Sequence, residues 1–140
     1  MKTEDSEVTS DEILLRLVWH HFFKLGPPVR VALRAFHPKS LEIDGISLFR
    51  LACLNDAQEC LVAIIKSENR TLNGIVGLGV DDIYKLGLSI LPSPNPRVAG
   101  HVVLPELNSN SWAVEKPIWH PVVEALAELS RNNILHYPST

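Results

Sequence analysis

NGIVGLGVDDIYKLGLSILPSPNPRVAGHVVLPEL, residues 73–107, decides the fold class of this chain. Its three short apolar runs are rich in Ile, Val and Leu, and a polar turn and a proline-rich bend separate them. Runs of this length and composition are typical of strands. We expect strands over 75–80, 88–91 and 101–104. Between the first two, a short helix is expected over 82–86, with Gly87 at its end.

The chain on either side of this stretch predicts the remaining elements. Thr9–Glu12 has the form of a capping box, and apolar residues follow it at helical spacing. We therefore expect an N-terminal helix over 10–25, which the Gly-Pro-Pro sequence at 26–28 would end. The other expected elements are helices over 56–67 and 121–132 and strands over 29–36 and 46–52. A short helix from Pro28 is the alternative to the strand over 29–36.

These elements predict a single α+β domain over 9–135. A mixed or antiparallel sheet of short strands would be flanked by an N-terminal helix, a middle helix and a C-terminal helix. The 140-residue length fits one domain with its own core. We expect a disordered N-terminal tail over 1–8 and a C-terminal tail over 136–140.

Composition restricts the classes of function. The net charge of −3 disfavours a protein that coats nucleic acid, because such proteins usually carry a basic excess. The polar, acidic start of the chain has no apolar core of a signal peptide, and no apolar run is long enough to span a membrane. Cys53 and Cys60 are too far apart in a helix for a disulfide, which favours buried thiols in a reducing cytoplasm.

Metal and cofactor motifs are absent from the sequence. The six histidines show no His-x-x-x-His spacing, and there is no Cys-x-x-Cys pair. The glycines at 74, 77 and 79 match neither a dinucleotide fingerprint nor a phosphate loop, and they favour close packing of a strand instead. We expect no metal and no cofactor.

One interpretation is a small metal-independent enzyme that acts on RNA or a nucleotide. His37 and His101 each lie at the end of an expected strand, with Arg34 and Arg50 nearby in the sequence. Two imidazoles could act as general base and general acid in phosphodiester cleavage, and arginine could hold the phosphate. An Arg, Ser and Glu spread over such strands could alternatively build a pocket for nucleotide transfer.

The favoured interpretation is a non-enzymatic protein–protein interaction or adaptor module that binds another protein or itself. The expected N-terminal helix is apolar over a wide arc, and two tryptophans lie in expected loops. The candidate interface residues are Trp19, Phe22, Phe23, Trp112 and Trp119. The alternation of short strands with capped helices resembles that of compact bacterial accessory proteins.

Overall fold

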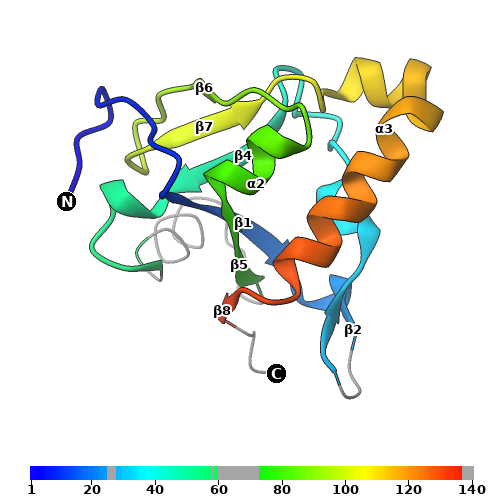
Figure 1. Cartoon of the computed structure of the whole chain (residues 1–140), viewed down its shortest axis with the longest axis horizontal. Coiled ribbons are helices and arrows are strands. Elements are labelled where there is room, and N and C mark those ends of the chain that lie inside the picture. Colours follow the sequence, from blue (N-terminus) through cyan, green and yellow to red (C-terminus); the bar gives the residue numbers. More distant parts are fainter. Residues whose placement is uncertain (25–27, 58, 60–72, 137–140) are drawn as a thin grey trace.

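The computed structural model describes residues 1–24, 28–57, 59 and 73–136. Its centre is an antiparallel six-stranded sheet with the strand order β6-β7-β4-β1-β5-β8 (Figure 1). Its strands are β1 (Ile13–Trp19), β4 (Ile46–Arg50), β5 (Asn73–Gly79), β6 (Leu91–Pro92), β7 (His101–Leu104) and β8 (Ile134–His136). A separate two-stranded ribbon pairs β2 (Phe23–Lys24) with β3 (Arg30–Val31).

One long helix, α3 (Ser109–Ser130), packs across one face of this sheet (Figure 1). Its buried side chains join a cluster with Leu14 and Val18 of β1 and Leu48 of β4. The opposite face carries a second cluster, which includes Leu15 and Phe49. The short helices are α2 (Val80–Lys85) and the 3-10 turns η1 (His20–Phe22), η2 (Leu33–Phe36) and η3 (Leu51–Cys53).

The predicted arrangement of three flanking helices is wrong, because the N-terminal helix over 10–25 does not form. Residues 13–19 are instead the strand β1, which pairs with β4 on one side and with β5 on the other. A central strand buries both of its faces, so its apolar residues run almost continuously and satisfy a helical pattern as well. The capping-box contact exists, with Thr9 N donating to Glu12 Oε2 at 2.8 Å, but it closes a turn before the strand.

The other expected elements have mixed outcomes. The C-terminal helix forms, but it begins at Ser109 rather than at Pro121. The middle helix over 56–67 lies almost wholly outside the described residues. The strand over 101–104 is β7, whereas 88–91 contributes only Leu91 to β6. Residues 29–36 form a two-residue strand followed by η2, which is closer to the alternative of a short helix.

Two predicted glycine roles are confirmed. A Cβ at Gly77 would lie 3.0 Å from Ile13 Cγ2, so this position of β5 lets a neighbouring side chain approach closely. Gly87 has φ +80°, a left-handed conformation that follows the last turn of α2.

Residues 1–12 cross the end of β4 and are held there by a buried ion pair. Arg50 donates through Nε and Nη2 to the two carboxylate oxygens of Glu12, each at 2.8 Å. Its remaining N–H groups donate to backbone oxygens of Ser6 and Glu7 at 2.8 and 3.2 Å. Burial alone would raise the pKa of the Glu12 carboxyl, but the hydrogen bonds from Arg50, the Thr9 amide and Lys2 lower it to about 2. This ion pair therefore fixes the N-terminal segment against the sheet.

Candidate functional site

A buried carboxylate fixes the loop that precedes β4. Glu42 accepts hydrogen bonds from Arg16 Nη1 at 2.7 Å, from Lys39 N at 2.9 Å and from Ser47 N at 2.7 Å. Burial opposes its ionisation, but the adjacent Arg16 guanidinium holds the pKa of this carboxyl below its ordinary value. The Glu42 carbonyl also accepts from Ser109 N at 3.1 Å, which connects the loop to the first residue of α3.

The two neighbours of this anchored carboxylate are large apolar residues in solvent. Leu41 is 89% exposed and Ile43 is 69% exposed. The backbone between them is held by Glu42, so these side chains project from a fixed loop. A fixed apolar side chain loses little conformational entropy when a partner covers it.

The first half of α3 is an unusual helix segment. Asn108 caps it, accepting from Ser111 N at 2.8 Å. Glu115 has non-helical angles (φ −120°, ψ 29°), and Pro117 and Pro121 lie inside the helix, where each removes a backbone hydrogen bond. Figure 1 shows this segment extending past the strands, at the top right. It is therefore a kinked extension of the helix that packs on the core.

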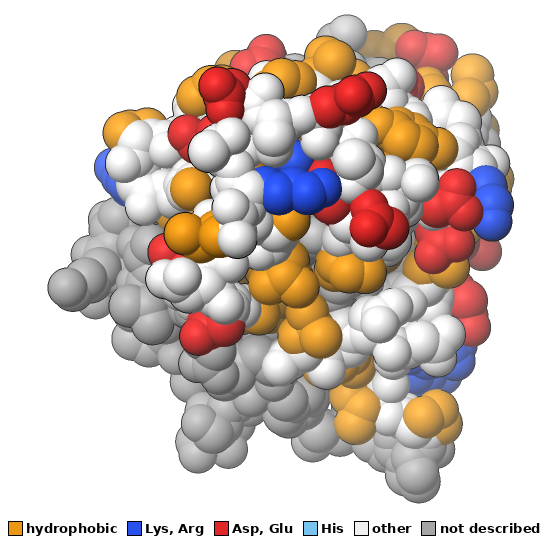
Figure 2. Space-filling view, turned by 60° about the vertical axis from the view of Figure 1, so that its left-hand side comes forward, with side chains coloured by type: hydrophobic (Ala, Val, Ile, Leu, Met, Phe, Trp, Pro, Cys, Tyr) orange, Lys and Arg blue, Asp and Glu red, His pale blue; other side chains and the backbone are white. Residues whose placement is uncertain are grey.

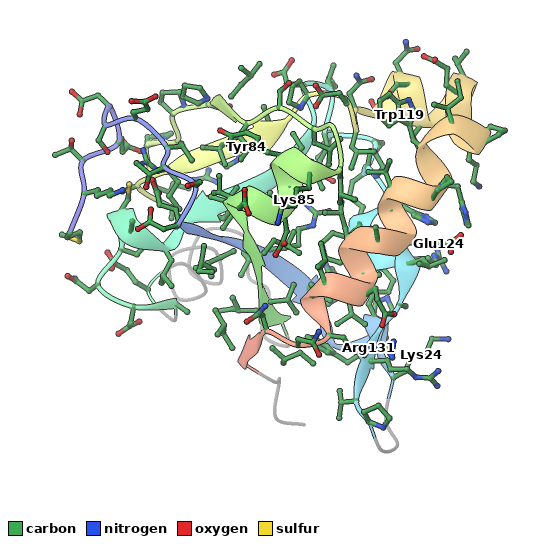
Figure 3. All side chains as sticks on the ribbon, in the orientation of Figure 1. Lys24, Tyr84, Lys85, Trp119, Glu124 and Arg131 are labelled. Atoms are coloured by element: carbon green, nitrogen blue, oxygen red, sulfur yellow. The ribbon has the colours of Figure 1, made fainter. Side chains whose placement is uncertain are left out.

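This extension carries both half-buried and exposed apolar side chains. Trp112 and Trp119, which lie on either side of the break at Glu115, both pack against the main core cluster. Trp119 is labelled on this segment in Figure 3. Val114 and Ile118, by contrast, are 73% and 61% exposed. The tryptophans hold the segment in place, and the aliphatic side chains face outward.

We name the four side chains Leu41, Ile43, Val114 and Ile118 the loop–helix surface. They come from two segments that the hydrogen bond between Ser109 and Glu42 joins. They account for four of the nine large hydrophobic side chains that are exposed in the described part of the chain. Large apolar side chains that lie in solvent on two segments joined in this way are candidates for an interaction site.

The same parts of the chain also carry a group of aromatic rings and cations that contact one another. The His37 ring packs on Trp112 with centroids 4.5 Å apart, and the His120 ring stacks on the same indole at 6.4 Å. Lys116 Nζ lies 5.3 Å from the Trp112 centroid, and Lys39 Nζ lies 4.8 Å from the ring centroid of Phe22. We name this group, together with Arg34, the basic–aromatic cluster. It comprises Phe22, Arg34, His37, Lys39, Trp112, Lys116 and His120.

The pKa of His37 reflects both its burial and the positive charges around it. Burial and then the neighbouring charges of Lys39, Lys116, His120 and Arg34 lower its pKa to about 4. Its Nε2 atom is buried and has no hydrogen-bond partner in the part of the chain that the structure describes. His37 is therefore a neutral imidazole at physiological pH, in a strongly positive environment.

The predicted interface residues are divided between surface and core. Trp19 is 41% exposed and contacts the His21 ring, with centroids 5.4 Å apart. Phe23 is buried in the core cluster. Phe22, Trp112 and Trp119 are half-buried and pack against the same cluster. Of the five, Phe22 and Trp112 belong to the basic–aromatic cluster, whereas Phe23 has no exposed surface to offer.

Of the four residues of the enzymatic interpretation, His37 and Arg34 lie together in the basic–aromatic cluster, whereas His101 and Arg50 lie elsewhere. His37 stacks on Trp112, on the face of the sheet that α3 covers. His101 packs on Phe49, with ring centroids 5.0 Å apart, and Phe49 belongs to the cluster on the opposite face. Arg50 is saturated by Glu12 and by the N-terminal backbone, so it has no free donor for a phosphate. This geometry offers no site at which the two imidazoles could act on one substrate.

A groove of about 670 Å³ lies between the N-terminal segment, the tip of α2 and the β6–β7 edge. Glu4, Asp5 and Glu7 line one wall, and Tyr84 and Pro92 belong to the other. Figure 2 views this side of the molecule and shows acidic side chains scattered among hydrophobic ones. Within the described residues, no three His, Cys, Asp or Glu side chains are placed to hold a metal ion.

The exposed aliphatic residues were not among the sequence candidates. A signal for Leu41 and Ile43 was present, because two large apolar residues flank a single acid within the polar stretch 37–45. Val114 lies in the polar stretch 108–116, which suggested a connection rather than a helix, and Ile118 lies between two prolines.

Comparison of the chain with protein-family models, curated proteins and solved structures gave no match. In the described part of the chain, no helix combines the length and apolarity that crossing a membrane requires.

Proposed function

We propose that this protein is a non-enzymatic binding module and that it docks another protein on the loop–helix surface. One observation carries the proposal. Four large aliphatic side chains lie mostly in solvent on two segments that buried contacts hold in place. Covering such side chains removes apolar area from water at little entropic cost, which is how interface hot spots arise.

The surroundings of this surface are also those of an interface. Trp112 and Trp119 pack the helix segment that carries Val114 and Ile118 against the core. Lys39 is two residues from Leu41 in the chain, and Lys116 is two residues from both Val114 and Ile118. Charged side chains next to apolar ones are typical of the rim of a protein interface. A protein with this one surface could serve as an adaptor subunit. We propose the cytoplasm as its location, where the buried free thiol of Cys53 fits a reducing environment.

Site-specific photocrosslinking in the native host cells tests this proposal. A benzophenone amino acid replaces Leu41 in one variant and Val114 in another. A matched control places it at Leu91, a large apolar residue on β6 that is 49% exposed. We expect Leu41 and Val114 to crosslink to one and the same protein, and Leu91 not to crosslink to it. Adding Ile118→Asp to the Val114 variant should remove the crosslink.

Two results would overturn the proposal. One is the absence of any common adduct from Leu41 and Val114. The other is an adduct that also forms from Leu91 or that survives Ile118→Asp. Circular dichroism and thermal unfolding of each variant establish that the chain is folded.

A further inference from the structure

We propose that the partner docks through an acidic segment, whose carboxylates meet the basic–aromatic cluster while its apolar side chains cover the loop–helix surface. This inference rests on the proposed docking function and adds the chemistry of the partner. It concerns Arg34, Lys39 and Lys116, the three permanently charged side chains of the cluster.

Arg34 and Lys116 differ from several other cations of the chain because no described carboxylate pairs with them. Elsewhere in the chain, carboxylates pair with Lys2, Arg16, Arg50, Lys85 and Arg131. Among the described residues, neither Arg34 nor Lys116 has a carboxylate within ion-pair distance. The charges of Arg34 and Lys116 are therefore not neutralised by the described carboxylates, and a docking carboxylate would relieve the repulsion between them and the neighbouring cations.

Aromatic rings hold the side chains of Lys39 and Lys116 in place. Lys39 Nζ donates to the Arg34 carbonyl at 2.8 Å and lies over the Phe22 ring. Lys116 lies over the Trp112 ring. Contact with an aromatic face places a cation without neutralising its charge. The lowered pKa of His37 supports the same conclusion, because the neighbouring cations contribute to it.

The aromatic rings of the cluster favour an acidic protein segment over single-stranded nucleic acid, which is also anionic. Nucleic-acid binders offer free aromatic faces on which bases stack. Here cations and histidines occupy the Trp112 ring, and both Phe22 and Trp112 pack against the core. The aliphatic loop–helix surface would have no role against a phosphate backbone. The net charge of the whole chain, −3, further disfavours a nucleic-acid partner.

A random twelve-residue peptide library displayed on phage, selected against the full chain, tests the inference. We expect the enriched peptides to carry negative net charge and at least two large apolar residues. The tightest peptide, labelled with fluorescein, is then measured by fluorescence anisotropy. Lys116→Glu and Arg34→Glu should each weaken its binding by about tenfold, and raising the salt concentration should weaken binding to the wild type. The matched control is Arg97→Glu, which makes the same charge change in the exposed loop between β6 and β7 and should leave affinity unchanged.

Contrary outcomes separate the two proposals. Enriched peptides that are neutral or basic, or equal losses from Arg97→Glu and Lys116→Glu, would refute the acidic segment. A fifteen-residue oligothymidine that binds more tightly than any peptide would refute it as well. If Ile118→Ser weakens peptide binding but the charge variants do not, the docking surface stands and only the acidic partner is refuted. If Ile118→Ser weakens the binding of no selected peptide, both the docking surface and the acidic partner are refuted.

Discussion

Replacing Glu12 by glutamine isolates the charge that holds the N-terminal segment against β4. The pKa of the Glu12 carboxyl falls from an ordinary value of 4.5 to about 2 in the folded protein, chiefly because Arg50 donates two hydrogen bonds to it. At about 1.4 kcal/mol per pKa unit, this difference corresponds to roughly 3 kcal/mol of stability at neutral pH. Glu12→Gln should therefore lower the free energy of unfolding at pH 7 by about 3 kcal/mol, since it also leaves the buried Arg50 without its counter-charge.

The stabilisation by the Glu12 carboxylate should decrease as the pH falls. The folded-state pKa lies below the unfolded value, so the stabilisation is complete above pH 4.5 and disappears as the pH falls toward 2. At pH 3 about 1 kcal/mol of it should remain. The difference in unfolding free energy between wild type and Glu12→Gln should therefore shrink by about 2 kcal/mol between pH 7 and pH 3.

Urea unfolding followed by tryptophan fluorescence at both pH values measures this difference. The control is Lys2→Met, which removes a second cation from Glu12. Because the Lys2 side chain is 39% exposed, its loss should cost under about 1 kcal/mol. A difference in unfolding free energy between wild type and Glu12→Gln of under about 1 kcal/mol at pH 7 would contradict this explanation. So would a difference that is the same at pH 3 as at pH 7.

Three further predictions follow from single positions. Gly45→Ala should destabilise the protein by more than about 2 kcal/mol in urea unfolding, because φ is +136° and a Cβ would lie 2.3 Å from the Leu104 carbonyl oxygen. In an NMR titration, the His37 imidazole should change its shifts near pH 4, well below the pKa of an ordinary histidine. Glu42→Gln should lower the free energy of unfolding by about 2–4 kcal/mol and weaken partner binding, because the buried charge of Arg16 loses its counter-charge and the loop its anchor.

The strands β4 and β7 were predictable from the sequence because each is a short run of residues that favour strands, with turn residues before and after it. β1 was not, because ILLRLVW is apolar enough to fit both a helix and a strand buried on two faces. What decided in favour of the strand was pairing with β5, about 60 residues later in the chain. Local periodicity contains no information about such a distant neighbour.

The candidate site was predictable in its residue types more than in its arrangement. Phe22, Arg34, His37 and Trp112 were all singled out, but Phe22 and Trp112 as part of a protein interface and the other two as part of a catalytic site. The structure puts them in one cluster through η2 and the first turn of α3, which pack together only in the folded chain. The buried partners of Glu12 and Glu42 were equally out of reach, since Arg50 and Arg16 are 38 and 26 residues away.

The prolines of α3 explain why a protein-binding surface can exist on a helix that also belongs to the core. A straight helix that packs its whole length on a sheet presents one buried stripe and one solvated, polar face. Pro117 and Pro121 remove backbone hydrogen bonds, and the break at Glu115 lets the first turns depart from the path of the rest. Trp112 and Trp119 bind these turns to the core, while Val114 and Ile118 lie in solvent without loss of packing. Replacing Pro117 by alanine should therefore straighten the helix and change the position of Val114, so that crosslinking from Val114 weakens while the core stays intact.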